Sequence, residues 1–166
     1  MKIKLAKKEI IHFVGIGGIG MSGLSLIMKG QGFKVQGSDI INNKNIDRLK
    51  KAKIKIFLGH SKKNLKNATI VVISSAIKNN NPELIEAKRK KIPIIKRGKM
   101  LASIVSLMKN IVVVGSHGKT TTTSLIASIF QETKIDPTII NGGVINSIKN
   151  TAKLGNSDWS ILEADE

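Results

Sequence analysis

The chain has 166 residues, 41% of them hydrophobic, which is enough for one domain with a core or for two small ones. It contains no cysteine, which excludes disulfides and cysteine-ligated metals and favours a reducing, cytoplasmic environment. Aromatic residues make up 3% and include no tyrosine, which disfavours the binding of single-stranded nucleic acid by base stacking.

The formal net charge of +17 is unevenly distributed along the chain. Residues 111–166 hold four lysines and six acidic residues, a net charge of −2, whereas residues 1–110 hold twenty-four basic and five acidic residues, a net charge of +19. A basic half of this kind is suited to nucleic acid or an anionic surface. The lysines are scattered rather than gathered in one stripe, which favours solvated faces instead.

The N-terminus has a basic start and a long apolar run, as a secretion signal would. Five glycines interrupt this run between Gly15 and Gly23, and no small-residue cleavage site follows. Glycines at this density disfavour a continuous hydrophobic helix, but they fit a strand, a tight turn and a helix start. We therefore predict no targeting segment and no membrane span.

Apolar runs and amphipathic stretches alternate through the first 108 residues. Strands are predicted at 10–15, 33–39, 54–59, 68–75 and 92–96, and helices at 20–32, 45–53, 79–91 and 98–108. The helix at 79–91 has the clearest signals, because Asn81 can cap it and Pro82 fits its first turn. Glu83 and Glu86 come early and basic residues late, an order that complements the helix dipole.

The pattern restarts at residue 110, with strands predicted at 110–115, 137–141 and 159–166 and a helix at 119–132. This alternation predicts an α/β fold with parallel, doubly wound sheets. The restart coincides with the change in charge. It predicts a Rossmann-like domain at 1–108, followed at 109–166 by a second, phosphate-loop segment.

The segment GIGGIG, Gly15 to Gly20, matches G-x-G-x-x-G between a predicted strand and a predicted helix. Gly15 permits a tight turn, Gly17 lets backbone amides approach a diphosphate, and Gly20 lets the helix pack closely on the strand. Asp39 ends the next strand, where an acid would hold a ribose hydroxyl in a nicotinamide enzyme. The motif alone leaves open a nicotinamide ligand, a UDP-type ligand, or a turn that binds nothing.

A second glycine cluster, GSHGKTTTT, also lies between a predicted strand and a predicted helix. Gly115 and Gly118 let backbone amides curl around phosphate oxygens. Lys119 is placed to neutralise terminal phosphates, Thr120 to offer a hydroxyl to Mg²⁺, and Thr121 to reach phosphate from the first helical turn. These features together predict a nucleotide-phosphate site.

The last predicted strand ends in acidic residues that suit a magnesium–nucleotide site. Glu163 and Asp165 are two positions apart, so they share one face of an extended strand. A carboxylate next to a phosphate loop is a usual ligand of Mg²⁺. The alternative is a solvated strand end. His117, inside the loop, is interpreted as a polar spacer with no proton-transfer role.

Seven segments occur in the order found in the Mur ligases, which the chain resembles over nearly its whole length. They are HFVGIGGIGMSGLS, GSD, VVISSAIKNNNPE, IPIIKRGKMLA, VVVGSHGKTTTTSLIASIF, GGVIN and EADE. The pairing of the glycine turn with a short Gly-x-His-Gly-Lys-Thr loop is highly specific, and it explains why Val113 stands where the general phosphate-loop pattern has glycine. The resemblance is strongest to members that join L-alanine to UDP-N-acetylmuramate.

The resemblance implies a UDP-sugar site in the first domain and an ATP site with Mg²⁺ in the second. The implied UDP-sugar site comprises Gly15, Ile16, Gly17, Gly18, Ile19, Gly20, Ser38, Asp39, Ser75 and Ala76. The implied ATP site comprises Gly115, Ser116, His117, Gly118, Lys119, Thr120 and Thr121, with Thr120 and Glu163 serving the metal ion. Lys119 is the implied catalytic residue, because it would stabilise charge on the transferring phosphoryl group.

The implied reaction serves peptidoglycan precursor synthesis. ATP phosphorylates the lactyl carboxylate of UDP-N-acetylmuramate, and the amine of L-alanine then displaces phosphate. The resemblance also implies that these residues lack most of the central domain and the C-terminal domain that would bind alanine. We therefore expect the 166-residue chain to be inactive alone, and its second segment to self-associate.

Two positions depart from the family pattern. Ser116 replaces the usual threonine and keeps a hydroxyl, which we expect to be harmless. Lys99 replaces the usual glutamate, which reverses a charge and removes any contact that the glutamate makes.

Two other functions compete with the ligase hypothesis. A nicotinamide-dependent oxidoreductase would use the first glycine turn, but hydride transfer needs no magnesium triphosphate site. A nucleic-acid-binding module would use the basic half, but the chain has few aromatics and no motif of a reading helix. We therefore expect no nucleic acid partner.

Overall fold

The computed structural model describes residues 6, 8–106, 108–145, 150–153 and 155–163. Contacts within the chain divide it into two compact units, residues 1–101 and 102–166. The division falls inside helix α4 (Arg97–Val105), whereas the domain boundary predicted from the sequence lies at residues 108–110. Among the described residues no helix is long and apolar enough to cross a membrane.

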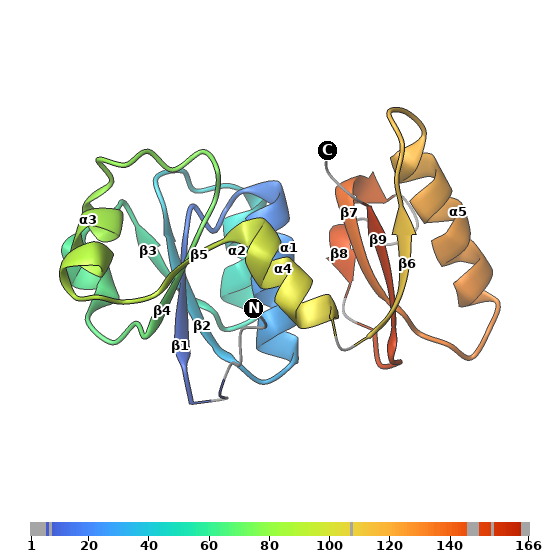
Figure 1. Cartoon of the computed structure of the whole chain (residues 1–166), viewed down its shortest axis with the longest axis horizontal. Helices are drawn as coiled ribbons and strands as arrows, with labels where there is room; N and C mark the ends of the chain where they lie inside the picture. The colour runs from blue at the N-terminus through green and yellow to red at the C-terminus, as the bar shows by residue number, and fades with distance from the viewer. Residues whose placement is uncertain (1–5, 7, 107, 146–149, 154, 164–166) are drawn as a thin grey trace. The chain divides into compact units, whose positions relative to one another are not determined.

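The first unit is built on a five-stranded parallel sheet with the strand order β3-β2-β1-β4-β5 (Figure 1). The strands are β1 (Ile10–Val14), β2 (Lys34–Asp39), β3 (Lys55–Leu58), β4 (Ile70–Ile73) and β5 (Ile94–Lys96). The predicted α/β fold with a parallel sheet is confirmed. The apolar run of β4 is almost entirely buried, as expected for an inner strand covered on both faces.

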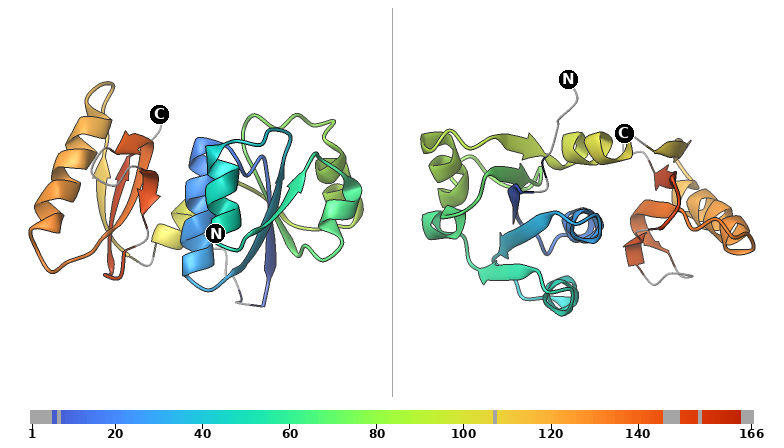
Figure 2. Two further views of the ribbon diagram at one scale, coloured as in Figure 1. Left: turned by 180° about the vertical axis from the view of Figure 1, so that it is seen from behind. Right: turned by 90° about the horizontal axis from the view of Figure 1, so that it is seen from below.

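Helices cover both faces of this sheet, as the right-hand view of Figure 2 shows. One face carries α1 (Ile19–Gly30) and α2 (Lys44–Lys51), and the other carries α3 (Pro82–Arg89) and the short 3₁₀ helix η1 (Lys62–Leu65). The sequence did not predict η1. It begins where the Ser61 hydroxyl accepts a hydrogen bond from the Lys63 amide, a local cap within a polar segment.

The core of the first unit lies between the sheet and these helices. Ile11, Phe13 and Val14 of β1 are fully buried, as are Ile27 and Met28 of α1. On the α3 face, a second cluster joins the sheet to η1 and α3, and it consists of Val14, Leu65, Ala68, Val71 and Ala87. Each large apolar side chain buried in this way contributes about 1.5–3 kcal/mol.

Helix α3 starts as the sequence predicts. The side-chain oxygen of Asn81 accepts hydrogen bonds from the amides of Glu83 at 2.9 Å and Leu84 at 3.3 Å. Pro82 occupies the first turn, where its missing amide hydrogen has no consequence. This cap fixes the helix start and thereby places the side chain of Glu83, which follows directly.

The second unit contains a four-stranded sheet with the order β6-β9-β7-β8, and α5 (Lys119–Gln131) packs against it (Figure 1). The strands are β6 (Lys109–Val113), β7 (Thr138–Ile145), β8 (Asn150–Lys153) and β9 (Trp159–Glu163). The pairs β6–β9 and β9–β7 are parallel, but β7–β8 is antiparallel. The expectation of parallel strands throughout is therefore wrong at this edge.

The sequence missed β8 because its segment, NTAK, has no apolar or alternating pattern. The strand forms by pairing with β7, which extends to Ile145, beyond the 137–141 predicted for it. A long strand provides backbone donors and acceptors that a neighbouring segment can use regardless of its own strand propensity.

Candidate functional site

The first glycine turn lies at the carboxyl edge of the first sheet, between β1 and α1. Gly15 has φ of +79°, which residues with a Cβ rarely adopt, and the amides of Gly15 and Ile16 donate to the Ser38 carbonyl at 2.9 and 3.0 Å. Gly18 precedes α1 and provides no side-chain cap. The first amides of α1 thus form the kind of helix N-terminus that binds phosphate.

Two residues of the predicted UDP-sugar motif turn inward. Ile16 is fully buried, and its side chain packs where Gly37 leaves room. The amide of Gly17 donates to Oδ2 of Asp39 at 2.8 Å. The structure therefore aims the Gly17 amide at the protein's own carboxylate, whereas Gly18 and Ile19 are exposed at the turn.

Asp39 anchors the glycine turn to the end of β2. Besides the Gly17 amide at Oδ2, its Oδ1 accepts from the Ile41 amide at 3.1 Å, and the side chain is buried. The carbonyl of Gly17 accepts from the side-chain amides of Asn43 at 3.2 Å and Asn45 at 2.8 Å. Both carboxylate oxygens of Asp39 thus accept hydrogen bonds from backbone amides, which differs from the ribose contact expected in a nicotinamide enzyme.

The Ser38 side chain points away from the turn, into a set of buried and partly buried polar residues that we call the Glu83 cluster. Its members are His12, Gln36, Ser38, His60, Asn64 and Glu83. The Ser38 hydroxyl donates to Oε2 of Glu83 at 2.5 Å. Ser38 and Asp39 therefore lie at the same edge, but Ser38 contacts the turn through its carbonyl and not through its hydroxyl.

The Glu83 carboxylate is fully buried but surrounded by donors. Burial alone raises the pKa of this carboxyl, but the groups that face it, from His12, Ser38 and Asn64, more than offset burial and lower its pKa below the usual value. A buried carboxylate with several hydrogen bonds is held in the ionised form. The cluster therefore places a negative charge beneath the carboxyl edge of the sheet, next to the first glycine turn.

The remaining residues predicted for the UDP-sugar site follow β4. Ser75 and Ala76 are exposed in a turn, and Ile77 of the same turn lies 3.3 Å from where a Cβ of Gly15 would stand. The turn after β4 is thus brought next to the turn after β1, as the parallel pairing of these strands requires.

Arg97 also lies at this edge, although the sequence did not single it out. A Cβ on Gly20 would come 2.7 Å from Nη1 of Arg97, so the guanidinium covers the first turn of α1. Its positive charge adds to that of the helix N-terminus. The available signal was a basic residue directly after strand β5, at a carboxyl end.

The second glycine loop joins β6 to α5 and is exposed from Val114 to Gly118. Gly115 and Gly118 have φ of +144° and +77°, conformations that residues with a Cβ rarely adopt. The ammonium of Lys119 donates to the Gly115 carbonyl and so lies over the loop. The Ser116 and His117 side chains are exposed within it, and Thr121 is exposed in the first turn of α5.

The structure brings Thr120 and Glu163 together, although they are 43 positions apart. The Thr120 hydroxyl donates to Oε2 of Glu163 at 3.2 Å. The parallel pairing of Val113 with Glu163 makes this contact, because it puts the end of β9 beside the loop. Two oxygen ligands next to a phosphate loop fit Mg²⁺, which takes one or two protein oxygens together with phosphates.

Asp165, the second predicted carboxylate of this strand, lies outside the described residues. Among the residues that are described, no group of three or more histidine, cysteine or acidic side chains is arranged to hold a metal ion. A metal ion at Thr120 and Glu163 would therefore depend on phosphate oxygens of a nucleotide for its other ligands.

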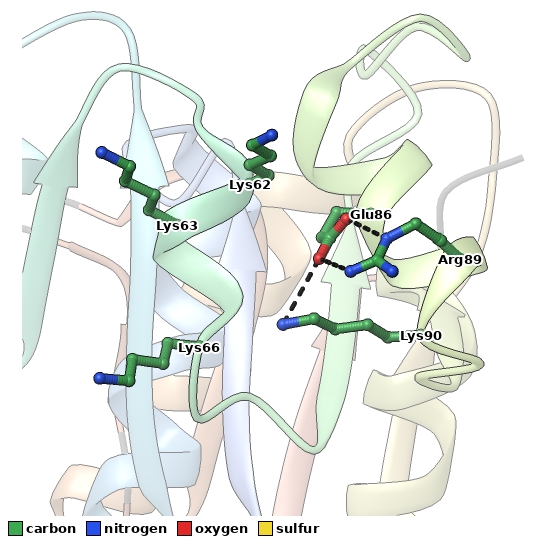
Figure 3. A pocket seen from close by; sticks show the side chains of 6 residues that line it. All are labelled: Lys62, Lys63, Lys66, Glu86, Arg89 and Lys90. Carbon is green, nitrogen blue, oxygen red and sulfur yellow. Dashed lines mark hydrogen bonds and ion pairs between the residues drawn. The ribbon is translucent and has the colours of Figure 1, made fainter.

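A basic groove of about 450 Å³ lies between η1 and α3 (Figure 3). Its lining consists of Lys62, Lys63, Lys66, Glu86, Arg89 and Lys90. Arg89 binds Glu86 through two hydrogen bonds of 2.7 and 2.8 Å, and Lys90 adds an ion pair at 3.4 Å. The Arg89 guanidinium is the main cause that lowers the pKa of Glu86 to about 2.

Sequence reasoning missed the role of Glu83, which it placed with Glu86 as an early-helix acid. The structure separates the two: Glu83 faces β2 and the β3–η1 loop, and Glu86 pairs with basic residues of its own helix. His60 was not selected either. Its only sequence signal was its position directly after a strand and a glycine.

Comparison with known proteins identifies the family. A sequence model described as Mur ligase family, catalytic domain, matches residues 10–109. The chain is 79% identical over all 166 residues to the UDP-N-acetylmuramate–L-alanine ligase of Pelagibacter ubique, and it covers 36% of that relative. It is 57% identical over 156 residues to the ligase of the same name from Rickettsia typhi, with coverage of 94% of this chain and 31% of the relative.

A solved structure agrees with these relatives. The crystal structure of UDP-N-acetylmuramate–alanine ligase MurC from Thermotoga maritima matches with a TM-score of 0.83 and 33% identity, over 92% of this chain and 36% of that one. The chain thus spans about a third of the length of the relatives it matches. The family model covers more than half of the residues, and the fold agrees, so the chain belongs to the Mur ligase family.

Proposed function

We propose that the chain forms the UDP-sugar-binding domain and the beginning of the ATP-binding domain of a ligase that joins L-alanine to UDP-N-acetylmuramate. The observation that carries this proposal is the 79% identity, across all 166 residues, to a relative that bears that name. The product of this reaction is a precursor of peptidoglycan.

In this proposal the diphosphate of the UDP-sugar lies at the start of α1. The exposed Gly18 and Ile19, the uncapped helix N-terminus and the guanidinium of Arg97 provide amide donors and positive charge. Ser75 and Ala76 border the same turn. Three other residues of the motif would support the turn and not contact the ligand. Ile16 is buried, the Gly17 amide binds Asp39, and the Ser38 hydroxyl binds Glu83.

The second loop binds the phosphates of ATP in the same proposal. The amides of Gly115 to Gly118, with Ser116 and His117 between them, would surround the phosphates, and Lys119 would leave the Gly115 carbonyl to contact them. Thr120 and Glu163 would hold Mg²⁺, which supplies charge neutralisation on the phosphate oxygens. Thr121 is placed to add a hydroxyl from the first turn of α5.

The chemistry proceeds in two steps. The lactyl carboxylate attacks the γ-phosphorus of ATP, which forms an acyl phosphate and releases ADP. The alanine amine then attacks the acyl carbon, the C–N bond forms as the C–O bond to phosphate breaks, and phosphate and a proton leave. Lys119 stabilises the charge that develops on the transferring phosphoryl group, a kind of electrostatic assistance worth about 2.7–4 kcal/mol at other sites.

The proposal can be tested by titrating the purified 166-residue chain, labelled with ¹⁵N, with UDP-N-acetylmuramate and in parallel with NADH. We expect the sugar nucleotide to shift the amide signals of Gly18, Ile19 and Ala76, and NADH to shift none of them at equal concentration. Binding of NADH alone would favour an oxidoreductase. Shifts confined to residues 109–163 would refute the assignment of the UDP-sugar to the first unit.

A further inference from the structure

The Glu83 carboxylate receives donors from two other parts of the sheet edge. Oε2 accepts from Ser38 at the end of β2, and Nδ1 of His60 lies 3.2 Å from the same oxygen. Oε1 accepts from the side-chain amide of Asn64 at 2.6 Å and from the Ser61 amide at 3.4 Å. One side chain of α3 therefore fastens the loop of residues 59–64 to β2.

The same loop is tied to β2 by backbone contacts. The amide of Gly59 donates to the Asp39 carbonyl at 2.8 Å, and the side chain of Asn64 donates back to the Gly59 carbonyl at 3.1 Å. Asp39 in turn holds the amide of Gly17. The contacts from Glu83 to the first glycine turn are thus continuous through adjacent residues of one strand.

The hydrogen bonds also assign the proton positions of the two histidines in the cluster. The side-chain amide nitrogen of Gln36 donates to the Asn64 carbonyl at 3.0 Å and lies 3.2 Å from Nδ1 of His12, so this Nδ1 is an acceptor and the proton of the neutral ring is on Nε2. Nε2 of His12 faces Oε2 of Glu83 at 3.5 Å, which is long for a hydrogen bond.

His60 has the opposite arrangement. The Ser38 hydroxyl already gives its only proton to Glu83, so the 3.0 Å contact between Ser38 Oγ and His60 Nδ1 requires the histidine to donate. The neutral ring of His60 therefore carries its proton on Nδ1, and Nε2 is an acceptor. The side chain is 14% exposed, and among the described residues none forms a hydrogen bond with Nε2.

We propose that Glu83 is a positioning residue for the carboxyl edge of the first sheet, where the UDP-sugar is proposed to bind. Its carboxylate binds residues 59–64 to β2 and keeps the proton of His60 on Nδ1. It does not touch the substrate. It acts through Ser38, which holds the glycine turn by its carbonyl, and through His60, whose outer nitrogen it keeps as an acceptor. The inference deepens the proposed function and rests on it only for the identity of the ligand at this edge.

Replacing Glu83 by glutamine provides a specific test because the two sides of the carboxylate differ. At Oε1 both neighbours are donors, the Ser61 amide and the Asn64 side chain. The backbone amide cannot accept a hydrogen bond, and Asn64 could accept one only by losing its bond to the Gly59 carbonyl. At Oε2 the Ser38 hydroxyl can rotate and His60 can change tautomer. The new amide NH₂ should therefore take the Oε2 position and move the His60 proton to Nε2.

The experiment uses all 166 residues with ¹⁵N-labelled histidine imidazoles, at about pH 8, above the ordinary range of histidine pKa values. In the unaltered chain we expect the Nδ1–H form for His60 and the Nε2–H form for His12. In Glu83→Gln we expect His60 to switch to Nε2–H and His12 to stay unchanged. The affinity for UDP-N-acetylmuramate should fall about tenfold, about the size of one lost hydrogen bond.

Glu86→Gln is the matched control, since Glu86 is on the same helix and pairs with Arg89 and Lys90 (Figure 3). It should leave both tautomers and the affinity as in the unaltered chain. An Nε2–H form of His60 in the unaltered chain would overturn the proposal even if Glu83→Gln fails to fold. An unchanged His60 tautomer in a folded Glu83→Gln, or an affinity equal to that of the control, would also overturn it.

If the unaltered chain binds no UDP-N-acetylmuramate, the proposed function fails and not the arrangement around Glu83. The tautomer of His60 in the unaltered chain and in Glu83→Gln then decides the positioning role by itself.

Discussion

Each unit of this protein contains a strand followed by a glycine-rich turn and a helix, yet the two turns are built differently. In the first, Asp39, Ser38 and two asparagine side chains bind the backbone of residues 15–17. In the second, residues 114–118 are exposed, and Lys119 reaches back to the loop's own carbonyl. A glycine motif in a sequence therefore does not reveal whether neighbouring side chains hold the turn or leave it open.

The glycines also serve different needs in the two units. Gly17 and Gly37 are needed for space, because a Cβ on either would lie within 3.0 Å of other atoms. Gly115 and Gly118 are needed for their backbone angles, and a Cβ on Gly118 would meet nothing within 4 Å. The first turn thus depends on close packing at Gly17 and on the positive φ of Gly15, whereas the second depends on the backbone angles of its glycines without close packing.

The largest effect should come from the open loop. In a full-length ligase that contains these residues, Lys119→Ala should lower turnover about 10³-fold, or about 4 kcal/mol of barrier, because the charge on the phosphoryl group loses its counterion. Binding of UDP-N-acetylmuramate should change less than about threefold, since the lysine belongs to the other unit. A phosphate-release assay and a binding titration measure the two effects.

Lys134→Ala is the control for this prediction, because Lys134 is exposed and follows the C-terminal end of α5, whereas the loop precedes its N-terminal end. Turnover of Lys119→Ala within about tenfold of the unaltered enzyme would contradict a phosphate role for Lys119.

In the first unit, the close packing of β2 against β1 and Ile16 should affect stability instead. Gly37→Ala would place a Cβ 2.6 Å from the Phe13 carbonyl and 2.6 Å from Cδ1 of Ile16. We expect a loss of about 2–3 kcal/mol in unfolding free energy, because the backbone of β1 cannot move aside. Urea unfolding followed by far-ultraviolet circular dichroism measures this loss.

Gly98→Ala makes the same chemical change in helix α4, where a Cβ would meet nothing within 4 Å. It should be neutral or stabilise by up to about 1 kcal/mol. If Gly37→Ala unfolds with the same free energy as Gly98→Ala, the close approach at Gly37 is relieved at little cost and the prediction is wrong.

A smaller effect is expected at the contact between α5 and β9. Thr120→Val removes the hydroxyl that binds Glu163 while keeping the shape of the side chain. Affinity for Mg-ATP should fall about tenfold, and affinity for ATP without magnesium should change less, if the hydroxyl binds the metal ion as proposed. Thr122→Val, at an exposed position of the same helix, is the control. Equal losses with and without magnesium would argue against a metal-binding role.

The smallest effect is a pH dependence that again distinguishes the units. The folded-state pKa of Glu83 lies below its unfolded value of 4.5, so its carboxylate adds stability above about pH 4.5 that is lost as the pH falls through the folded pKa. In the second unit, Lys153 lowers the pKa of Asp136, but this pair is partly exposed, and screening weakens it.

Acid should therefore destabilise residues 10–96 more than residues 109–163. Hydrogen exchange of core amides measures this difference between about pH 6 and about pH 3, a range that spans the ordinary pKa of a glutamate side chain. Glu83→Gln should flatten the pH dependence of the first unit and leave that of the second unchanged. A slope that is unaltered in this variant would exclude Glu83 as its source.

The sequence by itself determined the features that depend on near neighbours. The alternation of strands and helices, the Asn81–Pro82 helix start and the two glycine turns depend on periodicity, capping and backbone freedom within a few residues. These signals are local, so they can be identified before any partner is known.

The tertiary structure decided which residues meet. Strand order put Glu163 beside Thr120, pairing with β7 made a strand of the unpatterned segment 150–153, and the convergence of β1, β2 and α3 buried Glu83 among donors. The same early-helix pattern left Glu86 on the helix surface with basic partners. Which residues meet across a sheet, or between a helix and a sheet, depends on long-range packing. The hydrophobic periodicity and secondary-structure propensity of a single segment do not predict it.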